Sequence, residues 1–227
     1  MFHDTVFHDA GVIAGKDLRL EWRSRVTTNQ IAPFALLVLI LFAFALDPDR
    51  GILSRATAGL FWVAVLFSGL LALQRAFAIE AADGNRDGLR LSGLDPAGIF
   101  LGKAGAVALE LLVLELVLGA GVALMYGTTF RSWLLLVITC LVATTGVAAA
   151  GSLYGVLAAG LRVRETLLPL LLLPILAPVL LGATRSFEAA LAGVPSDGWP
   201  WVELLAAFAA IYVAFGVLAF GSLLEES

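Results

Sequence analysis

The sequence predicts an all-α, polytopic membrane protein with about six transmembrane helices in a single domain. Hydrophobic residues make up 60% of the 227 positions, charged residues only 14%, and the mean hydropathy is +0.97. This leaves too little polar surface to coat a soluble globule. Several runs reach or approach the ~20 apolar residues that a helix needs to cross ~30 Å of hydrocarbon. The runs are continuously apolar rather than alternating, which argues against a β-barrel.

Six spans follow from the positions of these runs. They are Ile31–Leu46, Ala58–Ile79, Ile99–Tyr126, Trp133–Gly160, Leu167–Ala183 and Trp199–Leu224. The first run is short for a spanning helix. Tilt or thinning of the bilayer would accommodate it, and a helical start inside Val26–Ala32 would extend it.

Two of the runs carry features that bear on helix packing. In the fourth, small residues repeat every four positions, at Gly151, Gly155 and Ala159. Such a face permits close helix approach. The fifth is interrupted by Pro169, Pro174 and Pro178. Each proline frees a backbone carbonyl, so this span contains either a kink that moves or a bent structural helix.

Basic residues gather in alternate connections. On one side of the membrane they are Lys16, Arg19, Arg23, Arg25, Arg75, Arg86, Arg90, Lys103, Arg162 and Arg164. On the other they are Arg50, Arg55, Arg131 and Arg185. Because positive side chains are retained in the cytoplasm, both termini of this multi-pass protein are expected there. Sparse basic residues at membrane boundaries give no indication of nucleic-acid binding.

The segment Gly11–Thr28 is expected to form a helix on the inner membrane surface. Lys16, Arg19 and Arg23 follow i, i+3, i+7 spacing and would form one basic stripe, with Trp22 beside it. Their long stems can reach along lipid headgroups, so membrane lipid is an expected partner. A solvated juxtamembrane helix is the alternative.

Residues that hold metals are scarce in this sequence. The two histidines, His3 and His8, precede the predicted interfacial helix in what is expected to be a mobile tail, and Cys140 is the single cysteine. No metal site and no intrachain disulfide are therefore expected. Residues Met1–Gln30 contain no apolar core of a signal peptide, so insertion is assigned to the first span.

The connection 80–98, between the second and third spans, is the longest charged stretch on the inner side. Its polar and turn-forming residues are Glu80, Asp83, Gly84, Arg86, Asp87 and Arg90, and its apolar ridge is Leu89, Leu91 and Leu94. Asp95 and Pro96 then resemble a helix cap and first helical position. A charged loop with a leucine ridge can dock onto a cytoplasmic partner. The alternative is that the leucines fold back onto the membrane surface.

Glu110 and Glu115 lie inside the third span, where a carboxylate costs ~2.5–3.5 kcal/mol on insertion scales. Five residues turn the helix by ~500°, which places the two side chains ~140° apart and on different faces. Lys103 is on nearly the same face as Glu110 but ~10.5 Å away along the axis, too far for direct contact. Satisfied glutamates at a helix contact or subunit interface are one interpretation. A proton or substrate pathway is the other.

Several stretches, taken in order, resemble those of the haem exporter protein B family (CcmB). They are LRLEWR at 18–23 with Asn29 and Pro33, GLFWVA at 59–64, LLALQRAF at 70–77 with Asp83-Gly84 beyond it, and LRVR at 161–164. In that family the corresponding patterns are a basic N-terminal helix before Asn-x-x-x-Pro, then PGxxWVA and LLALxRLF. The chain departs from the family pattern in residues 83–96, where an arginine and a second glycine replace leucine and acidic residues.

The resemblance covers nearly the whole chain and implies an ABC-2-type permease fold. It implies the permease subunit of the ABC complex of cytochrome c maturation, in the bacterial inner membrane. The implied partners are an ABC ATPase that binds ATP, a second permease copy, haem-handling membrane subunits and a haem chaperone. Haem is then a possible cargo, and no cofactor is bound directly. By the same resemblance, residues 80–98 are the coupling loop that docks on the ATPase.

The residues also bear on whether the chain could be an ATPase, an intramembrane enzyme or a scaffold. The sequence has no Gly-rich phosphate loop followed by Lys-Ser or Lys-Thr, so ATP hydrolysis would belong to a partner. An intramembrane enzyme that used Glu110 or Glu115 would need a nucleophile and a base spaced so that they could act together. The sequence offers no such pair, so a non-catalytic subunit is expected. The remaining alternatives are an ABC-2-type permease for another substrate and a noncatalytic membrane scaffold.

Overall fold

A computed structural model gives the fold and describes residues 2–25, 27–46, 51–81, 93–159 and 164–226. These residues form helices, and no strand occurs among them. The helices are α1 (Phe2–Ser24), α2 (Ala32–Ala45), α3 (Ile52–Ala81), α5 (Pro96–Met125), α6 (Trp133–Ala159), α7 (Arg164–Ala192) and α8 (Pro195–Glu226), with a π-helical turn η1 (Thr27–Ile31) before α2.

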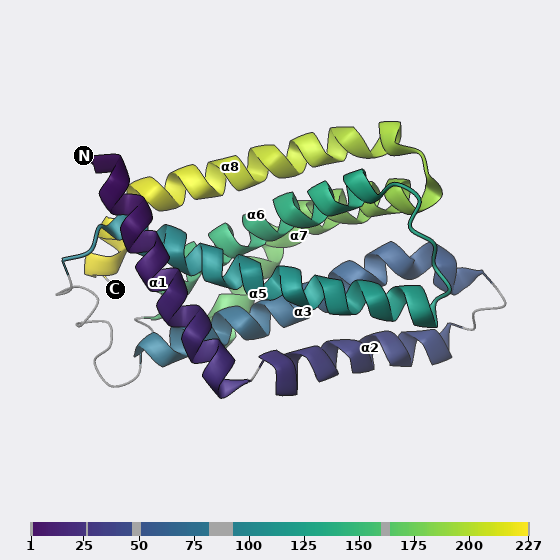
Figure 1. Cartoon of the computed structure of the whole chain (residues 1–227), viewed down its shortest axis with the longest axis horizontal. Coiled ribbons are helices and arrows are strands. Elements are labelled where there is room, and N and C mark those ends of the chain that lie inside the picture. The colour runs from purple at the N-terminus through teal and green to yellow at the C-terminus, as the bar shows by residue number, and fades with distance from the viewer. Residues whose placement is uncertain (1, 26, 47–50, 82–92, 160–163, 227) are drawn as a thin grey trace.

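The long helices lie roughly side by side, and α1 crosses one end of the bundle (Figure 1). Both chain termini lie at that same end (Figure 1), as an even number of spans requires. Within the described ranges, five helices are long and apolar enough to cross a membrane: α3, α5, α6, α7 and α8. The predicted all-α polytopic fold is therefore confirmed, and these five helices contain the second to sixth predicted spans, apart from Tyr126, the C-cap of α5, and the undescribed Gly160.

The first of the six predicted spans is the one that differs from the structure. α2 has 14 residues, which at ~1.5 Å per residue is short of the hydrocarbon thickness. The π-helical turn η1 leads directly into it and adds five residues. This is the extension inside Val26–Ala32 that the sequence allowed. By length, α2 qualifies as a span only as the second half of a bent pair with α1.

Helix α1 also differs from the prediction. It begins at Phe2 rather than Gly11 and ends at Ser24 rather than Thr28, so the predicted N-terminal tail is wrong. Arg25 follows with φ 51°, a left-handed conformation that ends the helix, and the chain bends by 52° between α1 and α2. The bend lets α1 run across the bundle while α2 runs along it.

The small-residue face of α6 packs against α3. A Cβ added at Gly151 would lie 2.3 Å from Leu73 Cδ1, and one added at Gly155 would lie 2.1 Å from the Phe77 ring. Leu73 and Phe77 are buried. The predicted close approach of helices at these two glycines is thus confirmed. At each glycine, a large side chain from α3 fills the space that a Cβ would take.

Replacing Gly155 with leucine is expected to lower the thermal stability of the detergent-solubilised protein strongly. The new side chain and the Phe77 ring would occupy the same space, and overpacking a core costs ~1–3 kcal/mol. Gly119→Leu is the matched control, because a Cβ at Gly119 meets nothing within 4 Å. Equal melting temperatures for the two variants would contradict this packing.

Candidate functional site

The candidate site is the junction of α1 with the end of α3 and the start of α5. These two helices flank residues 82–92, and α1 contacts both of them, since it packs along the start of α5 and pairs with Arg75 of α3. Helix α1 therefore touches both sides of the connection that sequence analysis selected for partner docking. Figure 1 shows α1 crossing the bundle at this end. Seven of the predicted docking residues lie outside the described residues: Asp83, Gly84, Arg86, Asp87, Leu89, Arg90 and Leu91. Glu80 belongs to the last turn of α3, and Leu94 is half-buried just before α5.

The start of α5 is capped and held by α1. Asp95 is the N-cap, and its side chain accepts a hydrogen bond from Ala97 N at 2.8 Å, with Pro96 at the first helical position, as predicted. The Asp95 backbone N–H in turn donates to Asp9 Oδ2 of α1 at 3.0 Å. Because the connection 80–98 re-enters the bundle at Asp95, this hydrogen bond ties its last residues to α1.

Two glycines let α1 lie directly on α5. A Cβ at Gly98 would lie 2.8 Å from Asp9 Cβ, and one at Gly102 would lie 2.6 Å from Ala10 O and 2.7 Å from Ile13 Cβ. Ile13 is 2% exposed, although it belongs to a helix at the end of the bundle. The backbones of α1 and α5 therefore cross at van der Waals distance, the geometry that a Gly-x-x-x-Gly pair permits.

Lys103 joins the same two helices by charge. Its ammonium lies 3.5 Å from Asp17 Oδ2 and 5.5 Å from the centroid of the Phe77 ring, and the side chain is 4% exposed. Lys16 lies 3.0 Å from the other oxygen of Asp17. Removing Asp17 would take a carboxylate away from an ammonium that is buried, which costs more than losing an exposed pair.

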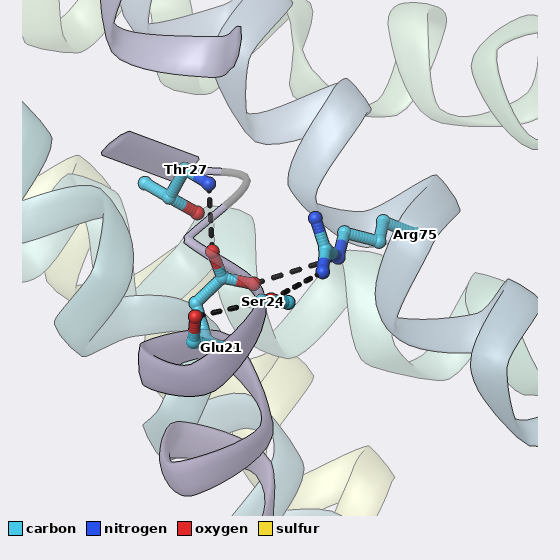
Figure 2. Close-up of polar contacts among 4 residues, drawn as sticks. All are labelled: Glu21, Ser24, Thr27 and Arg75. Atoms are coloured by element: carbon cyan, nitrogen blue, oxygen red, sulfur yellow. Dashed lines mark hydrogen bonds and ion pairs between the residues drawn. The ribbon is translucent and has the colours of Figure 1, made fainter. Parts of the chain in front are cut away.

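The end of α1 is fixed to α3 by Glu21, Ser24 and Arg75 (Figure 2). Glu21 Oε2 lies 3.5 Å from Arg75 Nε, and Arg75 Nη2 donates to Ser24 Oγ at 2.5 Å. Glu21 Oε1 accepts from the Thr27 N–H at 2.6 Å, on the far side of the bend. One carboxylate thus holds both the α1–α3 contact and the turn into α2.

The predicted basic stripe of α1 points away from this junction. Lys16, Arg19, Trp22 and Arg23 are exposed, Trp22 to 84%. Sequence analysis missed the opposite face, where Asp9, Ile13, Asp17 and Glu21 repeat every four residues and meet the bundle. Spacing of i, i+4 places such residues on one helix face, so the signal was present in the sequence. The acidic side chains received no assignment, because no partner for them was evident in the sequence.

The intramembrane glutamates have separate surroundings, as their spacing predicted. Glu110 is half-buried in a small cleft that Asp17, Glu21 and Arg75 also line, so it faces the α1 junction. Glu115 is 5% exposed, and its Oε1 accepts a hydrogen bond from Thr144 of α6. Glu115 is therefore part of a helix contact, whereas Glu110 adds a carboxylate beside the Glu21–Arg75 pair.

The chain is similar to known proteins over most of its length. The family model described as CcmB protein matches residues 10–227. Heme exporter protein B of Haemophilus influenzae is 33% identical over 186 residues, which are 82% of this chain and 84% of that protein. Heme exporter protein B of Pseudomonas aeruginosa is 30% identical over 209 residues, 92% of this chain and 94% of that protein. The protein of that name from Paracoccus denitrificans is 32% identical over 185 residues, 78% and 82% of the two chains.

Proposed function

This chain belongs to the CcmB protein family, and from that we propose that it is the membrane permease subunit of a haem exporter in cytochrome c biogenesis. The proposal includes an ABC-2-type fold formed by residues 1–227 as one domain. It places the protein in a bacterial inner membrane with both termini in the cytoplasm, since basic residues concentrate at the end where the termini lie.

We propose further that a partner ATPase drives this permease through residues 80–98. The observation that carries this is the α1 junction, since α1 holds Arg75 on one flank of the connection and Asp95 and Lys103 on the other. A force applied to the connection would reach α1 through either flank. The bend after Arg25 would pass it to α2, and the close contact at Gly102 would pass it to α5.

The proposed complex contains two permease and two ATPase copies, with haem-handling membrane subunits and a haem chaperone. The names of the similar proteins support haem as the transported group. In the proposal ATP binds only to the ATPase partner, and no cofactor is assigned to this chain. The alternative is a permease of the same type for another amphipathic cargo, in which case the complex would hydrolyse ATP without releasing a haem-loaded chaperone.

The experiment is purification of the tagged chain in mild detergent from cells that express the neighbouring genes. Wild-type protein is expected to retain an ATPase, and a variant with residues 80–96 replaced by a Gly-Ser linker of equal length is expected to lose it. Replacing residues 127–131, the connection at the other end of the bundle, is the matched control. Recovery of equal ATPase activity with all three proteins would refute the docking assignment.

Glu115→Gln is expected to leave stability and transport within about twofold of wild type, since glutamine keeps an oxygen that accepts from Thr144. The carboxyl would then be a packing element of the α5–α6 contact. Thermal stability and haem-chaperone release by the reconstituted complex are both measured. Normal stability together with lost release would assign Glu115 to a proton or substrate pathway instead.

A further inference from the structure

A polar cavity lies at the end of the bundle opposite α1. It has a volume of about 570 Å³ and is bordered by the first turns of α3, the connection between α5 and α6, and the last turns of α7. Its polar lining is Ser54, Arg55, Tyr126, Thr128, Thr129 and Arg131, together with Glu188. Neither a residue of α1, nor Arg75, nor any of the described residues 93–103 lines it, so it is separate from the α1 junction.

The cavity carries an excess of positive charge. Its one carboxylate, Glu188, is already paired with Arg185, whose Nη1 lies 3.1 Å from Glu188 Oε2. Arg55 and Arg131 form no ion pair with any residue that the structure describes. Two exposed guanidinium groups therefore face one cavity, and neither is ion-paired within the part of the chain that the structure describes.

The stem of Arg131 lies beside the turn that joins α7 to α8. It lies against Gly193, where an added Cβ would be 3.1 Å from Arg131 Cδ. Gly193 has φ 76°, in the turn that joins α7 to α8. The next residue, Ser132, donates its backbone N–H to Ala190 O at 3.1 Å. These contacts fix the backbone beside Arg131 to the end of α7.

Arginine is also rare at the end of the bundle that holds this cavity, which is assigned to the extracytoplasmic side. Basic residues are disfavoured outside the cytoplasm, and only four arginines lie in the connections and helix ends assigned to that side. Two of them, Arg55 and Arg131, line this cavity, and a third, Arg185, pairs with Glu188 of its lining; Arg50 lies outside the described residues. Topology alone would favour their loss, so their convergence on one cavity calls for a ligand.

We propose that this cavity binds the carboxylates of an acidic segment of an extracytoplasmic protein partner. Guanidinium forks and hydroxyls suit carboxylate oxygens. The walls offer few apolar groups, Ala58, Leu191 and Ala192, which does not suit a flat porphyrin. The cavity is bordered by helix ends and connections rather than lipid-facing flanks, which favours a ligand from the aqueous phase. The side of the membrane, and hence the partner's compartment, rests on the proposed function.

The test uses the purified complex in neutral phosphatidylcholine nanodiscs and a fluorescent hexaglutamate peptide, with hexaglutamine as the neutral probe. Anisotropy is expected to show hexaglutamate binding that weakens with salt and by about fivefold for each of Arg55→Gln and Arg131→Gln. Arg55→Lys and Arg131→Lys keep the charge and control for folding. Arg23→Gln, at the opposite end of the molecule, is expected to leave hexaglutamate binding unchanged.

Equal binding of the two peptides, or unchanged hexaglutamate binding by the Arg55→Gln/Arg131→Gln double variant, would overturn the proposal. Native mass spectrometry of the complex before reconstitution gives a further check. A phospholipid retained by wild type and lost by the double variant would show a lipid phosphate site and overturn it too. ATPase recovery is measured on the same preparations. Retained ATPase without peptide binding would refute only this inference, whereas absent ATPase would refute the proposed function and leave the peptide result interpretable.

Discussion

Gly102→Leu is expected to detach α1 from α5 and to lower transport per ATP in the proposed complex by about tenfold or more, while the spanning helices stay folded. At this position a Cβ would lie 2.6 Å from Ala10 O, a backbone atom that cannot turn aside. Overpacking costs ~1–3 kcal/mol, whereas a partly exposed ion pair contributes ~0–1 kcal/mol. α1 is held mainly by its crossing of α5 around Gly98, Gly102 and the buried Ile13, so a side chain at Gly102 acts directly on that contact and we expect α1 to yield before the bundle does.

Limited trypsin digestion measures this detachment, because α1 ends in the exposed Arg23 and the chain bends at the exposed Arg25. Faster cleavage at these sites is expected for Gly102→Leu. Gly105→Leu is the matched control on the same helix, since a Cβ at Gly105 meets nothing within 4 Å. Identical digestion of wild type and both variants would contradict the close crossing of α1 and α5.

Glu21→Ala is expected to have the second largest effect, because it removes two interactions at once. The carboxylate pairs with Arg75 across the α1–α3 contact and accepts the Thr27 N–H beyond the bend (Figure 2). Losing a hydrogen bond to a charged group costs ~1.5–3 kcal/mol. We expect faster trypsin cleavage near Arg25 and weaker coupling of ATP hydrolysis to release.

Two further variants separate the two interactions of Glu21. Glu21→Gln keeps an acceptor for Thr27 and loses the ion pair, so an intermediate effect is expected. The double exchange Glu21→Arg with Arg75→Glu restores opposite charges but not the acceptor, so a partial rescue is expected. If the exchange is no better than Glu21→Arg alone, the Glu21–Arg75 pair does not hold α1 in place.

Much of the fold was predictable because spanning helices are dictated by local composition. In a run such as Trp133–Ala159, the backbone N–H and C=O groups must form their hydrogen bonds within the helix, whatever lies beside it. The close helix contacts at Gly151 and Gly155 were predictable from their four-residue repeat. The sequence did not indicate that Leu73 and Phe77 are the side chains that pack there. The short first span was visible too, including its extension toward Val26.

The junction and the cavity were less predictable because they depend on contacts between distant segments. Asp17 and Lys103 are 86 residues apart, and nothing local signals that they meet. The acidic face of α1 received no assignment, while its basic stripe was singled out. Positive charges near a membrane have an immediate interpretation, but an acidic face needs a partner that only the fold supplies. Arg55 and Arg131 were noted only for topology.

The central claim is that α1 transmits the movement driven by ATP hydrolysis from the proposed coupling connection to the membrane helices. The most direct measurement is haem-chaperone release per ATP hydrolysed by the complex in proteoliposomes, for wild type and Gly102→Leu. We expect ATP hydrolysis to persist while release per ATP falls by about tenfold or more, within the range of coupling free energies between sites. Unchanged release per ATP in a variant whose α1 trypsin shows to be detached would contradict this claim.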